Sequence, residues 1–249
     1  MILTLLFLAQ AAVAHAGSIT ANEIVQRMMQ ADNERKVAFS GYTGMRRYSF
    51  ENKKVDKHAE MTVRVVCDQG GTKNFEVVAE SGPGFIRNHI IRRMIDAEHE
   101  ASETGEHEQT RITPQNYDFR LLGTEVLEGQ PSYVLEISPK TNNRFLVRGR
   151  IWVDAEDFGI MRVEGSPAKN PSFWIRSAHI VQRYNRIGKF WLPVINQSRA
   201  EARIFGVTEV RIDYSDYLVR DVKADSNRRT DIADAARGAA PLGLTHPLN

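Results

Sequence analysis

Cysteine is nearly absent from this chain. Cys67 is the only one among 249 residues, which excludes an internal disulfide and a zinc site built from several cysteines. An excess of charge of one sign is also lacking, because 33 basic residues face 31 acidic ones. Such a balance offers no electrostatic surface for nucleic acid, so no nucleic-acid partner is expected. We interpret Cys67 as a small apolar strand residue.

The common short motifs of enzymes are missing as well. There is no G-x-S-x-G turn, no phosphate-binding glycine loop and no H-E-x-x-H helix, so we expect neither enzyme activity nor a cofactor. One possible metal site stays open, because His99, Glu103 and His107 would share one face of a continuous helix. However, Thr104 and Gly105 interrupt that helix and glutamates surround it, which favours an exposed acidic surface without a metal.

Long apolar runs are limited to Ile2 to Val13, which is too short for an ordinary transmembrane helix. The run ends in Ala14-His15-Ala16, a small-x-small site, so residues 1–16 are predicted to be a secretory signal peptide cleaved before Gly17. No lysine or arginine follows Met1, and a buried N-terminal helix is the alternative. A lipoprotein would need a cysteine at the cleavage site, and Cys67 lies far from it. We therefore expect a soluble periplasmic protein without a lipid anchor.

A helix and three strands are predicted next. Thr20 and Glu23 form a capping box, and apolar residues at helical spacing follow before the helix fades between Asp32 and Lys36. This helix is expected to cover the core. The strands are predicted from aromatic-rich or alternating runs at Phe39 to Phe50, Met61 to Cys67 and Thr72 to Glu80.

A second helix is predicted from Phe85 to Ser102, after a Gly- and Pro-rich break. Its apolar stripe consists of Phe85, Ile86, Ile90, Ile91, Met94 and Ile95. Basic residues come early in this helix and acidic residues late, which opposes the helix dipole. We expect the helix to be marginal alone and to depend on docking, as a movable lid would.

From Tyr117 to Val219 the chain consists of one long strand after another. The expected strands are Tyr117 to Leu127, Ser132 to Ser138, Arg144 to Asp154, Ile160 to Gly165, Phe173 to Asn185, Phe190 to Ile204 and Gly206 to Leu218. A flat open sheet would leave exposed edges and an uncovered face, so this series must curl into a container. Residues 223–249 are polar and Ala-rich, and we expect a flexible tail there.

Five motifs within this series carry a family resemblance. They are Tyr133-Val134-Leu135-Glu136-Ile137-Ser138-Pro139, Ile151-Trp152-Val153-Asp154, Ile160-Met161-Arg162-Val163, Phe190-Trp191-Leu192-Pro193 and Tyr214-Ser215-Asp216-Tyr217. In this order, behind a signal peptide, the chain resembles the LolA-like outer-membrane lipoprotein-sorting proteins. The resemblance extends from Ile19 to Val219.

The resemblance implies a mainly β (α+β) fold over residues 17–222: a half-open, curled antiparallel β-barrel with amphipathic helices covering its concave face. It implies a periplasmic carrier that shelters the acyl chains of lipids or lipoproteins in an apolar cavity, in outer-membrane lipoprotein sorting. A membrane protein would be donor or acceptor. The alternative is an RseB-like regulatory module that senses lipid with the same cavity and binds a protein partner. The family offers no catalytic residues to carry over.

Candidate ligand contacts follow from the predicted wall and lid. Of the neighbours Arg46 and Arg47, one must point inward. An inward arginine would be either a polar latch to the covering helix or a head-group contact, unless it lies at a solvated edge or in an internal ion pair. The other wall candidates are Phe39, Met45, Met61, Val63, Val65 and Phe75, and the lid candidates are Phe85, Ile86, Ile90 and Met94. Trp152, Trp174 and Trp191 are expected in the core or the barrel wall.

Overall fold

The computed structural model describes residues 19–104, 109–170, 175–204 and 206–222. The predicted signal peptide and tail, as well as His107, Phe173 and Trp174, lie outside these residues. No helix within the described part is long and apolar enough to cross a membrane.

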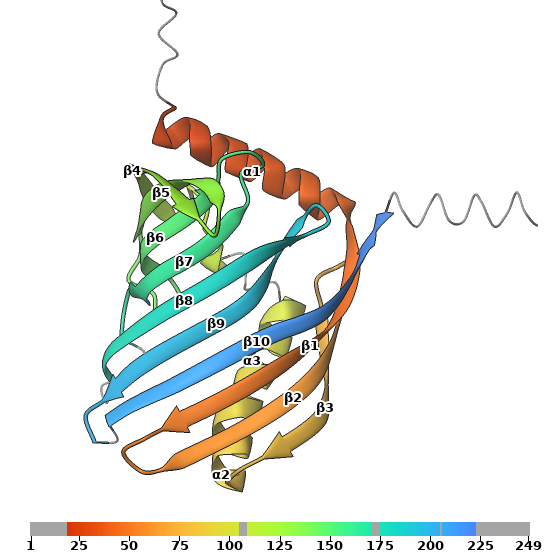
Figure 1. The fold of residues 1–249 in the computed structure, drawn as a ribbon, viewed down its shortest axis with the longest axis vertical. Coiled ribbons are helices and arrows are strands. Elements are labelled where there is room, and N and C mark those ends of the chain that lie inside the picture. Colours follow the sequence, from red (N-terminus) through yellow and green to blue (C-terminus); the bar gives the residue numbers. More distant parts are fainter. Residues whose placement is uncertain (1–18, 105–108, 171–174, 205, 223–249) are drawn as a thin grey trace, which may run out of the picture.

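One antiparallel sheet of ten strands forms the body of the protein (Figure 1). The elements are α1 (Ala21–Ala38), β1 (Phe39–Asn52), β2 (Lys57–Cys67), β3 (Lys73–Ser81), α2 (Gly84–Ile86), the π-helical turn η1 (Arg87–Ile91), α3 (Arg92–Thr104), β4 (Tyr117–Leu127), β5 (Gln130–Pro139), β6 (Val147–Asp154), β7 (Ile160–Pro167), β8 (Ile175–Ile187), β9 (Phe190–Ala202) and β10 (Gly206–Asp221). All ten expected strands are present, which confirms the fold class.

The strand order is β3-β2-β1-β10-β9-β8-β7-β6-β5-β4, so β3 and β4 are the two edges and the barrel stays half open. Bulges bend the strands, as between Phe39 and Gly41 of β1. Gly41 has φ 116°, and a Cβ there would lie 2.4 Å from the carbonyl oxygen of Cys67. Only glycine fits this bend without displacing the neighbouring strand.

The helices cover two different parts of the concave side (Figure 1). α1 packs across one end of the sheet, where Ile24, Val25 and Met28 join a hydrophobic cluster with residues of β4 to β7. The segment from α2 to α3 packs on β1, β2 and β10 and forms a second, separate cluster. These are two separate hydrophobic clusters, and a smaller third one consists of Val134, Trp152 and Met161. Cys67 is buried in the second, which confirms its interpretation as an apolar residue.

The first helix continues to Ala38, slightly beyond the end predicted between Asp32 and Lys36. Its last turns have few apolar residues, and docking supports them instead. Arg35 donates hydrogen bonds to the carbonyl oxygens of Asp157 and Lys189, at 2.6 and 3.0 Å. A side chain held by two distant turns keeps this polar end of the helix formed.

The second predicted helix contains an unforeseen π-helical turn. The buried residues Ile86 and Ile91 are five positions apart, whereas Ile91 and Ile95 are four apart. A π turn inserts one residue, which brings a spacing of five onto the same face. Phe85 does not join this face: its side chain is 70% exposed and its ring packs on His89 instead.

Candidate functional site

The predicted wall residues of β2 lie on the concave face. Met61, Val63 and Val65 are completely buried under the segment from α2 to α3. Phe39 and Phe75 are partly buried against the same cluster. The described residues of this region are packed against one another, so an acyl chain would have to displace the helix in order to reach this wall.

Met45 faces the other way. It pairs with Arg64 of β2, which is exposed on the convex face, while its neighbour Arg46 pairs with Val63 on the concave face. Arg47 shares the outward direction of Met45, and its side chain is more than half exposed in an ion pair with Asp213. Strand neighbours alternate between faces. The prediction that one of the two arginines points inward is confirmed, and that arginine is Arg46.

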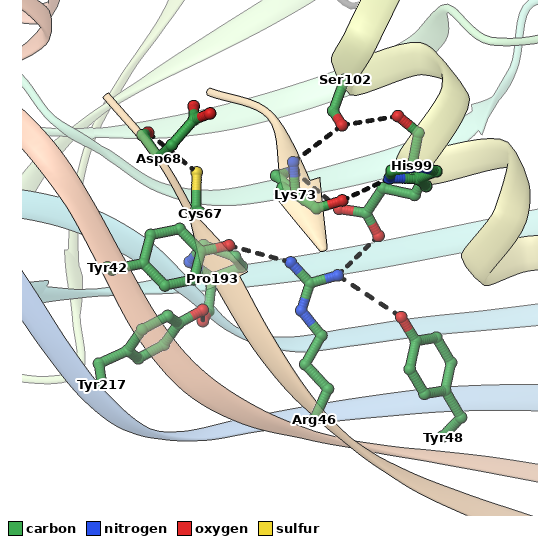
Figure 2. A network of polar contacts seen from close by, with 11 residues as sticks. Tyr42, Arg46, Tyr48, Cys67, Asp68, Lys73, His99, Ser102, Pro193 and Tyr217 are labelled. Atoms are coloured by element: carbon green, nitrogen blue, oxygen red, sulfur yellow. Dashed lines mark hydrogen bonds and ion pairs between the residues drawn. The ribbon is translucent and has the colours of Figure 1, made fainter. Parts of the chain in front are cut away.

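Arg46 is 3% exposed and joins the sheet to the covering helix. Its Nη1 lies 2.6 Å from Oε2 of Glu98 on α3. It also donates to the hydroxyl of Tyr42 at 3.1 Å and lies 3.5 Å from the hydroxyl of Tyr48, as Figure 2 shows. Its guanidinium is 4.9 Å from the ring centroid of Tyr214. This combination of an ion pair, hydroxyls and an aromatic face compensates the cost of burying the charge.

The charged groups of this network stabilise one another in their ionised forms. Burial alone would raise the pKa of the Glu98 carboxyl, but Arg46 and Lys73 outweigh it and hold that pKa below its ordinary value. Burial likewise opposes the charge of Arg46, yet Glu98 and the nearby tyrosines raise its pKa. Both groups are therefore ionised at neutral pH. The network is an internal ion pair that also joins β1 to α3 as a polar latch. Both are interpretations that the sequence offered, beside a head-group contact and a solvated edge.

A second set of contacts fastens α3 to the edge strand β3. Nζ of Lys73 lies 2.7 Å from Oε1 of Glu98, the carboxylate oxygen that does not pair with Arg46. The backbone N–H of Lys73 donates to the hydroxyl of Ser102 at 3.0 Å. Nδ1 of His99 is 2.6 Å from the carbonyl oxygen of Lys73. His99 is thus bound to the backbone, and its Nε2 lies 3.6 Å from Glu103. Within the described residues no group of three or more possible ligands is placed for a metal ion.

A cavity of about 390 Å³ lies under α1, away from the predicted lid. Its apolar lining includes Met28, Met29, Ile112, Val147, Ile160 and Val163. Aromatic side chains complete it: Tyr117, Phe145, Phe158, Tyr184 and Trp191. Burial raises the pKa of Tyr184 far above its ordinary value, so its hydroxyl stays protonated. The volume falls within the range of small-ligand pockets, and an apolar lining suits a hydrocarbon chain.

Ion pairs tether α1 on both sides of this cavity. Asp32 pairs with Arg111 from the segment before β4. Arg35 pairs at 3.3 Å with Asp157 in the turn between β6 and β7. The indole N–H of Trp191 donates to the carboxylate of Asp157 at 2.9 Å. The helix is thus held over the cavity by polar groups at its rim.

Sequence reasoning missed this cavity. The helix from Thr20 was interpreted only as a cover for the core, and Trp191 as core or wall. The signal was the combination of two adjacent methionines, Met28 and Met29, with aromatic residues in the later strands. A single sequence does not show which strands curl under which helix, because the contacts between α1 and β6 to β9 span more than a hundred residues.

Comparisons with known proteins describe the fold only. A model of a family of unknown function (DUF5686) matches residues 113–217. The search of curated proteins gave no match. A DUF1329 family protein from Desulfovibrio piger has a TM-score of 0.42 and 13% identity over 82% of this chain and 94% of that one. A putative outer membrane lipoprotein-sorting protein domain from Vibrio parahaemolyticus has a TM-score of 0.42 and 12% identity, over 78% of this chain and 93% of that chain. A LolA superfamily protein from Nitrosomonas europaea has a TM-score of 0.36 and 14% identity, over 82% of this chain and 96% of that chain.

The class of protein that the coordinates define is a curled, half-open antiparallel sheet with helices on its concave side. This is the fold that the LolA-like resemblance of the sequence implies.

Proposed function

We propose that this protein is a periplasmic carrier that shelters an acyl chain of a lipid or lipoprotein between its sheet and the covering helices. The observation that carries the proposal is the apolar cavity under α1, with aromatic walls and polar tethers at its rim. Most of the lining is apolar, which favours binding of a hydrocarbon chain. Sorting of lipoproteins to the outer membrane is the role in which such a carrier would serve.

The energetics of transfer fit a cavity that polar contacts close. Burying a hydrocarbon chain yields about 0.8 kcal/mol per methylene relative to water. Little of this is gained when the chain comes from a membrane, where it was already buried. Opening and closing must therefore be nearly balanced against lipid occupancy. Partly exposed ion pairs at the rim, such as Asp32 with Arg111, are contacts of modest net strength that suit this requirement.

The region under α3 has a place in the same proposal. Its wall and lid candidates, including Val63, Ile86, Ile90 and Met94, are packed together while the Arg46–Glu98 latch is closed. We propose that they contact lipid only after this latch opens, as a second compartment for a larger or multiply acylated cargo. Met45 and Phe85 would not contribute, because Met45 lies on the convex face and Phe85 is exposed.

A binding and transfer experiment tests the proposal. The purified protein is titrated with a fluorescent fatty acid, palmitate is added as a competitor, and native mass spectrometry reports the stoichiometry. We expect an equimolar complex and transfer of the probe from donor to acceptor vesicles. Protein that stays empty throughout the titration would contradict a carrier. Binding without transfer would instead favour a regulatory module that senses lipid.

A further inference from the structure

A second recess lies outside α1, next to the cavity. It is an open groove of about 1000 Å³ between the outer side of α1, the β6–β7 turn and the β8–β9 turn. The groove is larger than the cavity, and more of its lining residues are charged. Two side chains, Arg35 and Phe158, line both spaces. Cavity and groove are therefore adjacent compartments with a common wall.

Of the two side chains that line both spaces, Phe158 is held by contacts of its ring alone. Its ring stacks on Tyr133 with centroids 6.2 Å apart, and the Arg27 guanidinium lies 5.3 Å from its centroid. Arg35, by contrast, is fixed by Asp157 and by the carbonyl oxygen of Lys189. A chain that passes from the groove to the cavity would displace the phenylalanine rather than the arginine.

The backbone of Phe158 is strained. Its φ is 58°, in the left-handed region that a bulky side chain seldom adopts. Such strain costs free energy and persists at ligand clamps and switch regions, where the surroundings enforce it. Here the turn holds the Phe158 ring in the lining of both compartments.

The groove presents charges of both signs. Arg27, Arg186 and Lys189 line it together with Glu34 and Glu156. The carboxylate of Asp157 already receives Arg35, Arg186 and Trp191, and Lys189 pairs with Asp221. Arg27 and Glu156 are both exposed and line the groove from two different elements: Arg27 belongs to α1 and Glu156 to the β6–β7 turn. An anionic and a cationic group of one ligand would both find a partner there.

We propose that this groove binds a zwitterionic head group, with a phosphate and an ammonium, of a single-chain lipid whose acyl chain enters the cavity past Phe158. The phosphate lies at Arg27 and the ammonium at Glu156. A lysophosphatidylethanolamine has this chemistry. The inference rests on the proposed acyl-chain binding and adds a lipid class to it.

Competition against a bound fluorescent fatty acid tests the head-group site. Lysophosphatidylethanolamine, lysophosphatidylglycerol and palmitate are compared as competitors of the full chain. We expect the zwitterionic lipid to bind about tenfold more tightly than palmitate. Glu156→Gln should remove most of this preference and leave palmitate binding unchanged, because palmitate has no ammonium group, whereas Arg27→Gln should weaken the binding of both lipids. Arg64→Gln, an exposed arginine on β2 far from α1 in the fold, is the matched control and should change neither.

Phe158→Ala separates passage from recognition. We expect faster release of the bound fatty acid, with the preference among head groups retained. Equal affinity for all three competitors, or a preference that survives Glu156→Gln, would overturn the head-group site. Failure to take up even palmitate would instead refute the proposed carrier function, so the two failures are distinguishable.

Discussion

The Arg46 guanidinium on β1 and the Glu98 carboxylate on α3 form an ion pair at 2.6 Å that fastens the covering helix to the sheet. Arg46 is almost completely buried, whereas the side chain of Glu98 is 32% exposed. The pair is therefore asymmetric: the carboxylate is near solvent and can leave, but the arginine cannot follow it into water. Whatever removes the carboxylate leaves an uncompensated charge inside the sheet.

Replacing Glu98→Gln should destabilise the protein. The glutamine keeps the shape but leaves Arg46 buried without a counter-charge, which we expect to cost about 2 kcal/mol of unfolding free energy. Urea unfolding measures this, and hydrogen exchange should become faster in residues 84–104. Glu100→Gln on the exposed side of the same helix is the control and should be close to neutral. Similar losses in both variants would show that the latch contributes nothing specific.

Acid should open the same latch. Because the pKa of Glu98 is lower in the folded protein, its stabilising effect is complete above the unfolded-state value of about 4.3 and is lost as the pH falls through the lower folded value. The groups that face it are Arg46 from β1 and Lys73 from β3, which stay protonated throughout. After correction for the intrinsic pH dependence of amide exchange, hydrogen exchange of residues 84–104 should therefore be constant down to about pH 4.3 and accelerate only below it. The acceleration should be absent in Glu98→Gln, and an identical acid response in the variant would exclude Glu98 as the titrating group.

The latch illustrates how much of this fold can be predicted from the sequence. Period-two alternation identified β2 and the inward direction of Val63, because burial of one sheet face imposes it locally. The same rule required either Arg46 or Arg47 to point inward. It did not choose between them, and it did not indicate Glu98 as the partner, because that choice depends on how α3 lies across the sheet. The π-helical turn between Ile86 and Ile91 follows from the same docking and has no signal in helical periodicity.

Asp157→Asn should loosen the end of α1. Asp157 receives Arg35 at 3.3 Å, Arg186 at 3.5 Å and the indole of Trp191 at 2.9 Å, and loss of its charge weakens all three contacts. We expect a loss of about 1–2 kcal/mol in unfolding free energy and a changed fluorescence spectrum of the tryptophan.

Asp118→Asn provides the comparison for this tether. Asp118 pairs with Lys140 at 3.7 Å, and both side chains are exposed, so its removal should have almost no effect. If Asp157→Asn were equally silent, the end of α1 would not depend on this tether, and another contact would have to hold the helix over the cavity.

Filling the cavity tests where the acyl chain lies. Met29→Trp adds bulk to a partly buried position on α1 that lines the cavity, and we expect uptake of a fluorescent fatty acid to be abolished at a stability cost of about 1–3 kcal/mol. Met29→Leu conserves the volume and should bind as the natural protein does. Ile90→Trp makes the corresponding change in the region under α3 and should leave uptake unchanged, because this region is already packed. The opposite pattern, with uptake lost in Ile90→Trp and kept in Met29→Trp, would move the acyl chain from α1 to the lid that the sequence predicted.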